Sequence, residues 1–111
     1  MIKRIKDFIQ GKPAKKRSPL WAKVRAEHLV RNPFCAVCGG TKNLDTHHIL
    51  PFHEFPELEL DTYNLITLCE SKNLGVTCHL FFGHLGNYRK INKMVVIDAI
   101  QWREKLNATR S

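Results

Sequence analysis

The first clear pattern in the chain is a stripe of apolar positions at helical spacing in residues 20–28. The stripe consists of Leu20, Trp21, Val24 and His28. Ser18 and Pro19 precede it as a typical N-cap and first helical position. Pro33 follows it, and the residue before a proline is disfavoured in the α region. The pattern therefore predicts a helix that begins at Pro19 and ends before Asn32.

Short apolar runs rich in β-branched residues come next. They predict strands over residues 44–49 and 65–69. Residues 50–63 lie between the strands, contain two prolines and show no clean periodicity, which is typical of a loop. A further helix is predicted over residues 78–82, and Gly83 weakens its continuation.

The clearest helical periodicity lies in residues 91–107. Its apolar positions are Ile91, Met94, Val95, Ala99, Trp102 and Leu106. Such a stripe more often closes a domain core than binds a partner, so we expect it to face the core. Residues 2–9 show a brief apolar periodicity that predicts one helical turn ahead of a basic segment.

Length and composition predict one small domain. A chain of 111 residues that is 43% hydrophobic can bury a modest core, and small cores often need a disulfide or metal staple. We expect a basic N-terminal arm at residues 1–17 and a single domain at residues 18–111. The start has no apolar signal region and no stretch is long enough to cross a membrane. These features favour a cytoplasmic protein with reduced cysteines.

Basic side chains are concentrated at the two ends of the chain. Residues 1–17 carry seven basic side chains and one acidic one, whereas residues 54–88 carry five acidic side chains and one basic one. Basic ends suit a polyanion such as DNA, although a charge run alone often serves only solubility. The candidate nucleic-acid contacts are Lys15, Lys16, Arg17, Arg89 and Lys90.

The cysteines are spaced like zinc ligands. Cys35 and Cys38 form a CxxC knuckle followed by Gly39, which can supply the tight turn between two thiolates. Cys69 and Cys78 complete a set of the right number and type for structural Zn²⁺. Eight residues separate that second pair, where a second CxxC is commoner, so Cys78 is the least typical ligand.

Histidines accompany both cysteine pairs. His47 and His48 are adjacent in the first predicted strand, so their side chains point to opposite faces. One imidazole can then bind a metal while the other does different chemistry. His79 directly follows Cys78, and Asn64 directly precedes the second strand. Taken singly, each histidine is more often structural, His79 could also bind the zinc, and Asn64 could be a turn residue.

Taken together, the CxxC knuckle, the histidine pair in residues 46–51, the segment 64–69 and the Cys-His pair at 78–79 resemble the HNH endonuclease family. The resemblance covers about residues 19–88. It implies an α+β fold, the zinc-stapled ββα-metal or His-Me finger domain, here with helices flanking it on both sides.

The resemblance also assigns roles to individual residues. It implies that His48 is the general base, that His47 and His79 bind the catalytic cation, and that Asn64 holds the loop near the base. Some relatives use a further helical histidine on the metal, and His84 is the candidate here. His84 follows His79 by five residues, or about 140° around an ideal helix, so sharing one ion requires a bulge near Gly83.

The leading hypothesis is a metal-dependent DNA endonuclease that uses a single Mg²⁺, Mn²⁺, Ni²⁺ or Zn²⁺ ion and leaves 5′-phosphate and 3′-hydroxyl ends. The alternatives are a zinc-stapled nucleic-acid-binding module without catalysis and a structural zinc protein with a partner surface on its last helix. Small proteins that resemble this family are frequent in phages and mobile elements, where they act in packaging, restriction or homing. A homodimer would allow both DNA strands to be cut.

Overall fold

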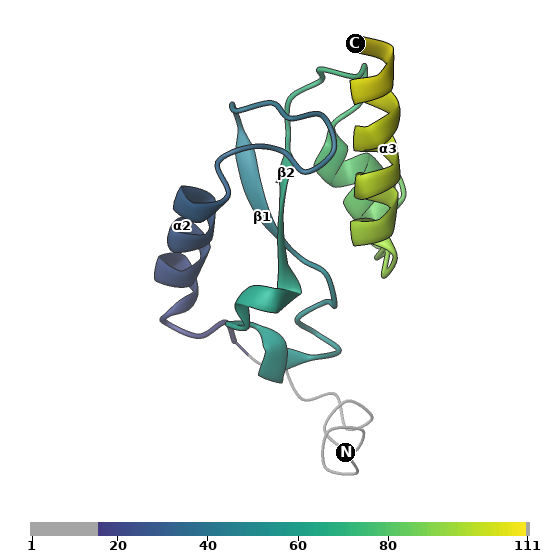
Figure 1. The fold of residues 1–111 in the computed structure, drawn as a ribbon. Helices are drawn as coiled ribbons and strands as arrows, with labels where there is room; N and C mark the ends of the chain where they lie inside the picture. The colour runs from purple at the N-terminus through teal and green to yellow at the C-terminus, as the bar shows by residue number, and fades with distance from the viewer. Residues whose placement is uncertain (1–15, 111) are drawn as a thin grey trace.

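The computed structural model describes residues 16–110, and its centre is a two-stranded antiparallel sheet between helical layers (Figure 1). The main elements are α2 (Trp21–Arg31), β1 (Leu44–His48), β2 (Leu65–Cys69), η3 (His79–Gly83) and α3 (Val95–Arg110). Two short 3₁₀ turns, η1 (Pro56–Leu58) and η2 (Thr62–Asn64), lie between the strands. The predicted order of helix, strand, strand, helix and helix is confirmed, and the fold is a small α+β domain.

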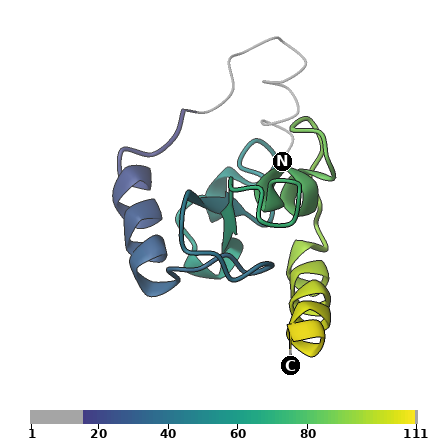
Figure 2. The same ribbon diagram turned by 90° about the horizontal axis from the view of Figure 1, so that it is seen from above.

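Each face of the sheet is covered by a different helical layer. On one face, the Thr46 hydroxyl of β1 donates to the Arg25 carbonyl of α2 at 3.2 Å. On the same face, the Thr67 hydroxyl of β2 donates to the carbonyl of Asn32 at 3.0 Å. In Figures 1 and 2, η3 and α3 lie on the side of the sheet opposite α2. Neighbouring residues of β1 therefore face different layers, which is what separates His47 from His48.

The hydrophobic core is centred on the cysteines. Its buried members are Cys35, Val37, Cys38, Leu68, Cys69, Cys78, Phe82, Val95 and Ala99. Four of these nine residues are cysteines, so the stability of the core depends on the bonds that the sulfur atoms make. This agrees with the expectation that so small a core needs a staple.

The first helix and the loop between the strands differ in detail from the prediction. Helix α2 begins at Trp21 because Ser18 and the next residues form a turn, in which the Ser18 hydroxyl oxygen accepts from the Leu20 amide at 3.1 Å. Leu20 is consequently 55% exposed and lies outside the apolar stripe. The predicted end is correct, since α2 stops at Arg31. Residues 50–63 contain the turns η1 and η2, where the sequence suggested only loop.

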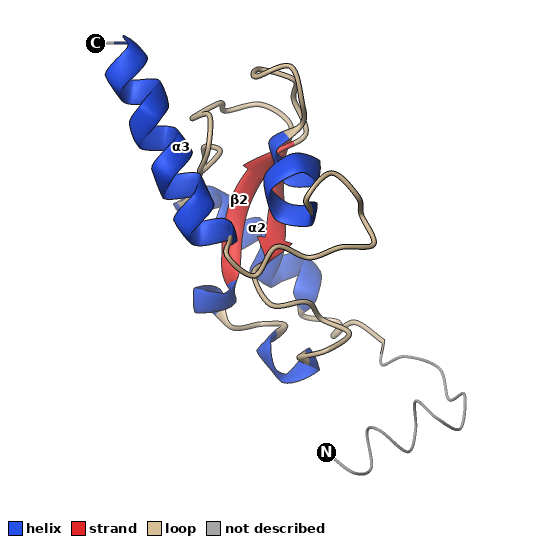
Figure 3. Ribbon diagram, turned by 90° about the vertical axis from the view of Figure 1, so that its right-hand side faces the viewer, coloured by secondary structure: helices blue, strands red, loops and turns tan. Residues whose placement is uncertain are grey.

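The last helix begins later than predicted. The prediction placed its start at Ile91, whereas α3 begins at Val95 because the Asn92 side chain accepts from the Met94 amide and turns the chain there. Val95 and Ala99 are buried, but Met94 is 55% exposed, so only part of the predicted stripe faces the core. Figure 3 shows the C-terminal half of α3 projecting away from the sheet.

Among the described residues, no helix combines the length and apolar character that a membrane span requires. The helical turn predicted in residues 2–9 lies outside the described residues.

Candidate metal centres and active site

The first candidate centre is formed by the four cysteine sulfur atoms, which lie within 4.8 Å of one another. The Sγ atoms of Cys38 and Cys69 are 3.6 Å apart, and all four cysteines are free. A disulfide would bring two sulfur atoms to about 2.05 Å. Tetrahedral Zn²⁺ with Zn–S bonds of about 2.3 Å would separate its sulfur ligands by about 3.8 Å. The observed spacing therefore fits structural zinc, and it includes Cys78, the least typical ligand of the predicted set.

The surroundings of the cysteine cluster also suit thiolates. The Gly40 amide and the Asn73 side-chain amide donate to Cys38 Sγ at 3.4 and 3.5 Å. Gly39 has a φ of +76°, as expected for the glycine of a tight knuckle. A hydrogen bond from Cys78 lowers the pKa of Cys35 to about 4, whereas burial and the Cys35 charge raise the pKa of Cys69 to about 11. Full ionisation of the cluster thus needs a cation.

The second candidate centre brings together the three predicted metal-binding histidines. His47 lies in β1, His79 is the first residue of η3, and His84 directly follows η3. Their ligand atoms lie within 4.8 Å of one another. The Nε2 atom of His79 is 3.0 Å from His47 Nδ1 and 3.2 Å from His84 Nε2. Nitrogen ligands at about 2.05 Å from a tetrahedral metal would be about 3.3 Å apart. The spacing fits one shared ion.

Hydrogen bonds on the outer sides of two of these rings indicate which nitrogen faces the centre. His79 Nδ1 donates to the Glu70 carboxylate at 2.5 Å, and His84 Nδ1 donates to the Lys90 carbonyl at 2.8 Å. In the neutral rings, both Nε2 atoms then carry lone pairs and no hydrogen. Two facing lone pairs 3.2 Å apart repel each other unless a cation lies between them. Outer partners of this kind are typical of metal-binding histidines.

Burial favours the neutral form of His47 and His84, the form that metal binding requires. Burial and the neighbouring His79 and His84 rings lower the pKa of His47 to about 3. Burial also lowers the pKa of His84, although its bond to the Lys90 carbonyl acts in the opposite direction. His47 Nε2 is buried and has no hydrogen-bond partner among residues 16–110.

A wide helical turn brings His84 beside His79. Residues His79–Gly83 form a π-helix, whose hydrogen bonds span five residues and reduce the angle between positions five apart. The bulge that the sequence required near Gly83 is therefore present. A Cβ atom on Gly83 would lie 3.0 Å from the Cε1 atom of His47, so the absence of a side chain there lets the His47 ring approach the turn.

Sequence reasoning missed a carboxylate group behind His79. Glu70 accepts from His79, and its second oxygen accepts from the Tyr88 hydroxyl at 3.2 Å. Burial and the adjacent Glu70 raise the pKa of Asp45. Burial alone would raise the pKa of Glu70, but hydrogen bonds from His79 and Asp45 lower it. Nothing in the sequence pairs Glu70 with a histidine nine residues later, because the intervening loop decides that contact.

His48 lies on the opposite face of β1, as the alternation predicts. Its Nε2 donates to the Glu59 carbonyl at 2.9 Å, and its ring stacks on Trp21 with centroids 4.3 Å apart. The remaining nitrogen, Nδ1, accepts from the Arg17 guanidinium at 3.2 Å. Burial and the Arg17 charge lower the pKa of His48, although the Glu59 carbonyl raises it. The ring is therefore neutral near pH 7, with its tautomer determined by Glu59.

Asn64 connects the end of β1 to the loop that carries Glu59. Its side-chain oxygen accepts from the Leu50 amide at 2.8 Å, and its nitrogen donates to the Leu50 carbonyl at 3.1 Å. The same nitrogen lies 3.3 Å from the Leu58 carbonyl. Asn64 is 6% exposed and touches neither histidine through these bonds. These bonds connect the residues that follow β1 to the turn at Leu58.

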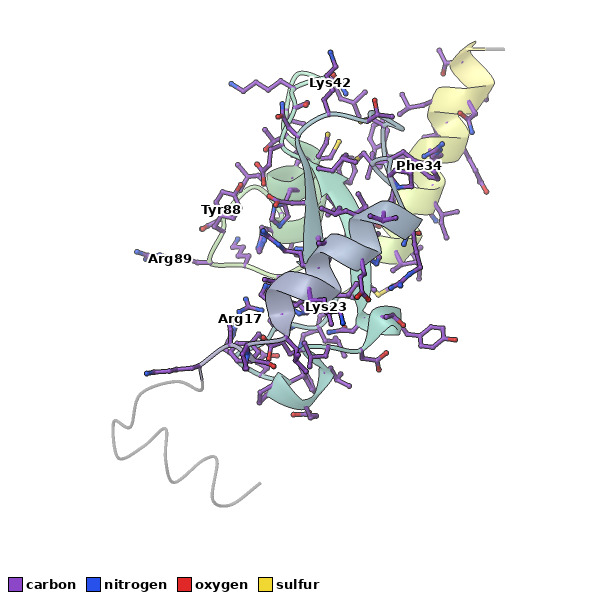
Figure 4. The ribbon with its side chains drawn as sticks, turned by 90° about the vertical axis from the view of Figure 1, so that its left-hand side faces the viewer. Arg17, Lys23, Phe34, Lys42, Tyr88 and Arg89 are labelled. Atoms are coloured by element: carbon purple, nitrogen blue, oxygen red, sulfur yellow. The ribbon has the colours of Figure 1, made fainter. Side chains whose placement is uncertain are left out.

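Both histidine groups border one cleft of about 450 Å³. Its lining includes His47, His48, His79, His84, Arg17, Arg25, Arg89, Trp21, Phe52 and Tyr88. In Figure 4, Arg17, Tyr88 and Arg89 extend on the same side of the molecule.

Of the candidate nucleic-acid contacts, Arg17 and Arg89 line the cleft, whereas Lys16 and Lys90 are exposed outside it. Lys15 lies outside the described residues. Arg25 lines the cleft as well and was missed by sequence reasoning, since nothing distinguished it from other basic residues of α2.

Residues 35–79 match the family model of HNH endonucleases. No curated protein and no solved structure matches the chain. The matched segment contains the cysteine knuckle, both strands, the histidine pair and His79, so the resemblance seen in the sequence is confirmed there. The α+β fold and the clustered cysteines are consistent with a zinc-stapled ββα-metal domain. Residues 35–79 are thus similar to the HNH endonuclease family, and this match suggests nuclease activity in general.

Proposed function

We propose that this protein is a metal-dependent DNA endonuclease with His48 as its general base. The observation that carries the proposal is one cleft bordered by a neutral, oriented histidine and by a separate group of three imidazoles spaced for one ion. The arginines that line the same cleft favour a phosphate-bearing substrate.

The hydrogen bonds of His48 define which of its atoms receives the proton. Nε2 donates to the Glu59 carbonyl, so Nδ1 holds the lone pair that can take a proton from water. The Trp21 ring and the Glu59 carbonyl keep the imidazole in this orientation. Water deprotonated at Nδ1 attacks the scissile phosphorus opposite the departing 3′ oxygen, which leaves a 5′-phosphate and a 3′-hydroxyl.

Arg17 occupies the position from which the phosphate approaches. Its guanidinium lies 3.2 Å from His48 Nδ1 and is held over the Phe52 ring, 4.5 Å from the ring centroid. In the proposed complex the guanidinium moves from Nδ1 to a phosphate oxygen and frees the base. A divalent ion such as Mg²⁺, Mn²⁺, Ni²⁺ or Zn²⁺ on the three imidazoles would stabilise negative charge on the phosphate and the leaving oxygen.

Asn64 supports this reaction without touching the reacting atoms. By joining Leu50 to the Leu58 carbonyl, it keeps the loop that presents the Glu59 carbonyl close to the end of β1. The basic arm at residues 1–17 would contact the DNA backbone. The protein would act in the cytoplasm of a bacterial or phage-infected cell, and a homodimer would cut both strands.

The test is nicking of supercoiled plasmid by the zinc-loaded full chain with EDTA, Mg²⁺, Mn²⁺ or Ni²⁺. We expect metal-dependent nicking that falls by roughly 10²–10⁴-fold in His48→Ala, the range typical of a lost general base. Added imidazole should restore part of the activity, because the space beside Trp21 can admit the free base.

Zinc content and thermal unfolding of His48→Ala serve as the controls: the zinc content should match that of the wild type and the unfolding transition should stay cooperative. A folded His48→Ala protein that nicks at the wild-type rate would refute the assignment of the base. If the wild type binds plasmid but does not cut it in the presence of any of these metals, the protein is instead a zinc-stapled nucleic-acid-binding module.

A further inference from the structure

The turn that carries His84 has an unusual hydrogen-bond pattern. In an α-helix, the Gly86 amide would donate to the Phe82 carbonyl four residues earlier. Here the Gly86 amide donates to the Leu80 carbonyl at 2.9 Å instead. The Asn87 amide likewise donates to the His84 carbonyl at 3.0 Å and not to that of Gly83. The carbonyls of Phe82 and Gly83 are therefore left for partners outside the turn.

Asn92 supplies both partners. Its side-chain amide donates to the Phe82 carbonyl at 2.9 Å, and its backbone amide donates to the Gly83 carbonyl at 3.0 Å. Phe82 is 5% exposed and Asn92 is 6% exposed, so water is a poor replacement for these bonds. Asn92 therefore holds the wide turn through the carbonyls of Phe82 and Gly83, the two residues immediately before His84.

The Asn92 side chain is itself held from the other side. Its nitrogen also donates to the Asp98 carboxylate at 2.7 Å, and its oxygen accepts from the Met94 amide at 3.0 Å. These contacts join the start of α3 to the end of η3. The connection between η3 and α3 also contains Lys90, whose carbonyl accepts from His84 Nδ1.

We propose that Asn92 is a positioning residue for the histidine centre: it holds the Phe82–Gly83 turn open so that His84 faces His47 and His79 as the third metal ligand. This inference rests on the proposed metal site and extends it to a residue outside the matched segment 35–79. Asn92 touches no metal or substrate and acts only through His84.

The experiment is a calorimetric titration of the zinc-loaded full chain with Ni²⁺ in the absence of DNA. We expect Asn92→Ala to weaken Ni²⁺ binding about 10- to 100-fold, the usual cost of losing an outer partner of a metal ligand. In a His84→Ala background the same substitution should change the affinity less than about twofold, because its effect passes through His84.

Asn92→Ser separates this role from the capping of α3. The serine hydroxyl can still accept from the Met94 amide but is too short to bond the Phe82 carbonyl. Asn92→Ser should therefore weaken Ni²⁺ binding as much as Asn92→Ala does, but its thermal stability should stay closer to that of the wild type. Thr67→Val is the matched control, since it removes one buried hydrogen bond on the opposite face of the sheet and should leave Ni²⁺ affinity unchanged.

Wild-type Ni²⁺ affinity in Asn92→Ser would overturn the proposal. So would an equal loss of affinity with and without His84, because that result describes a general structural role. The titration contains no DNA, so its result does not depend on whether the protein cleaves.

Discussion

The two candidate metal centres differ in how much water can reach them. Cys35, Cys69 and Cys78 are fully buried and Cys38 is 6% exposed, whereas His79 and His84 are half-buried and border the cleft. A closed set of four thiolates is typical of structural zinc, and an open set of three ligands leaves a position for water or substrate. This difference suits the cysteine cluster to a structural metal and the histidine group to the chemistry proposed above.

The two centres are nevertheless connected through adjacent residues. Cys78 belongs to the cysteine cluster, and the next residue, His79, belongs to the histidine group. The direction of η3 is therefore determined at its start by the buried centre and at its end by the Asn92 contacts. We expect damage at the cysteines to abolish both centres, and damage at the histidines to abolish only one.

The largest effect is expected from Cys38→Ser. Removing one thiolate from the buried cluster should eliminate cooperative unfolding, because structural zinc contributes about 10–16 kcal/mol in small zinc domains. Thermal unfolding followed by circular dichroism and a colorimetric zinc assay would measure this. His47→Ala is the contrasting variant, which should keep its zinc and its cooperative transition. A Cys38→Ser protein that unfolds like the wild type would show that the fold does not depend on this centre.

An intermediate effect is expected from Gly83→Ala at the open centre. The added Cβ would lie 3.0 Å from the His47 ring, so the imidazole must shift by a few tenths of an ångström. We expect roughly tenfold weaker Ni²⁺ binding, in the range of outer-partner losses, with zinc content unchanged. Calorimetric titration with Ni²⁺ measures the affinity.

Gly75→Ala is the matched control for Gly83→Ala. Gly75 has a φ of +84°, and a Cβ atom added there would have no neighbour within 4 Å. Alanine at this position therefore strains the backbone without touching a metal ligand. It should lower stability by about 1 kcal/mol and leave Ni²⁺ affinity unchanged. Equal Ni²⁺ affinities in the two variants would contradict the steric argument at Gly83.

The smallest effect is expected from Arg17→Ala. Losing one phosphate contact should weaken DNA binding several-fold and reduce the slope of log affinity against log salt concentration by about 1. Thermal stability should hardly change, because Arg17 is exposed at the open cleft. Fluorescence anisotropy with a labelled duplex at several salt concentrations gives the slope.

Arg103→Ala provides the opposite case at the closed centre. The Arg103 guanidinium donates to the Cys35 carbonyl at 3.1 Å and lies over the Phe34 ring. Its loss should lower stability by about 1 kcal/mol and leave the salt slope unchanged. Equal changes in stability and in DNA binding for the two arginine variants would contradict the expectation that the cysteine cluster supports the fold and the cleft binds DNA.

Local patterns were enough to predict the strands and the spacing of the candidate ligands. The alternation along β1 correctly placed His47 and His48 on opposite faces, because neighbouring strand residues cannot point the same way. The five-residue interval between His79 and His84 meant that sharing one ion would require a bulge near Gly83, and η3 is such a wide turn. The start of the last helix was wrong, since the capping contact of Asn92 outweighs the apolar periodicity that extends back to Ile91.

Contacts between distant segments could not be predicted in this way. Trp21 was expected to be an ordinary apolar position on α2, yet its ring stacks on His48. The Glu59 carbonyl that orients His48 belongs to a backbone whose path depends on Asn64 and two 3₁₀ turns. A backbone carbonyl has no signature in sequence, because every residue has one.

The sequence by itself determined the order of the elements, the supply of sulfur and imidazole ligands and the alternation that separates His47 from His48. Those features depend on residue type and on the short-range geometry of strands and turns. Only the tertiary structure decided which nitrogen of each ring faces the cleft, that Glu70 supports His79 and that Asn92 holds the turn before His84. These choices depend on hydrogen bonds between segments that meet only when the chain packs.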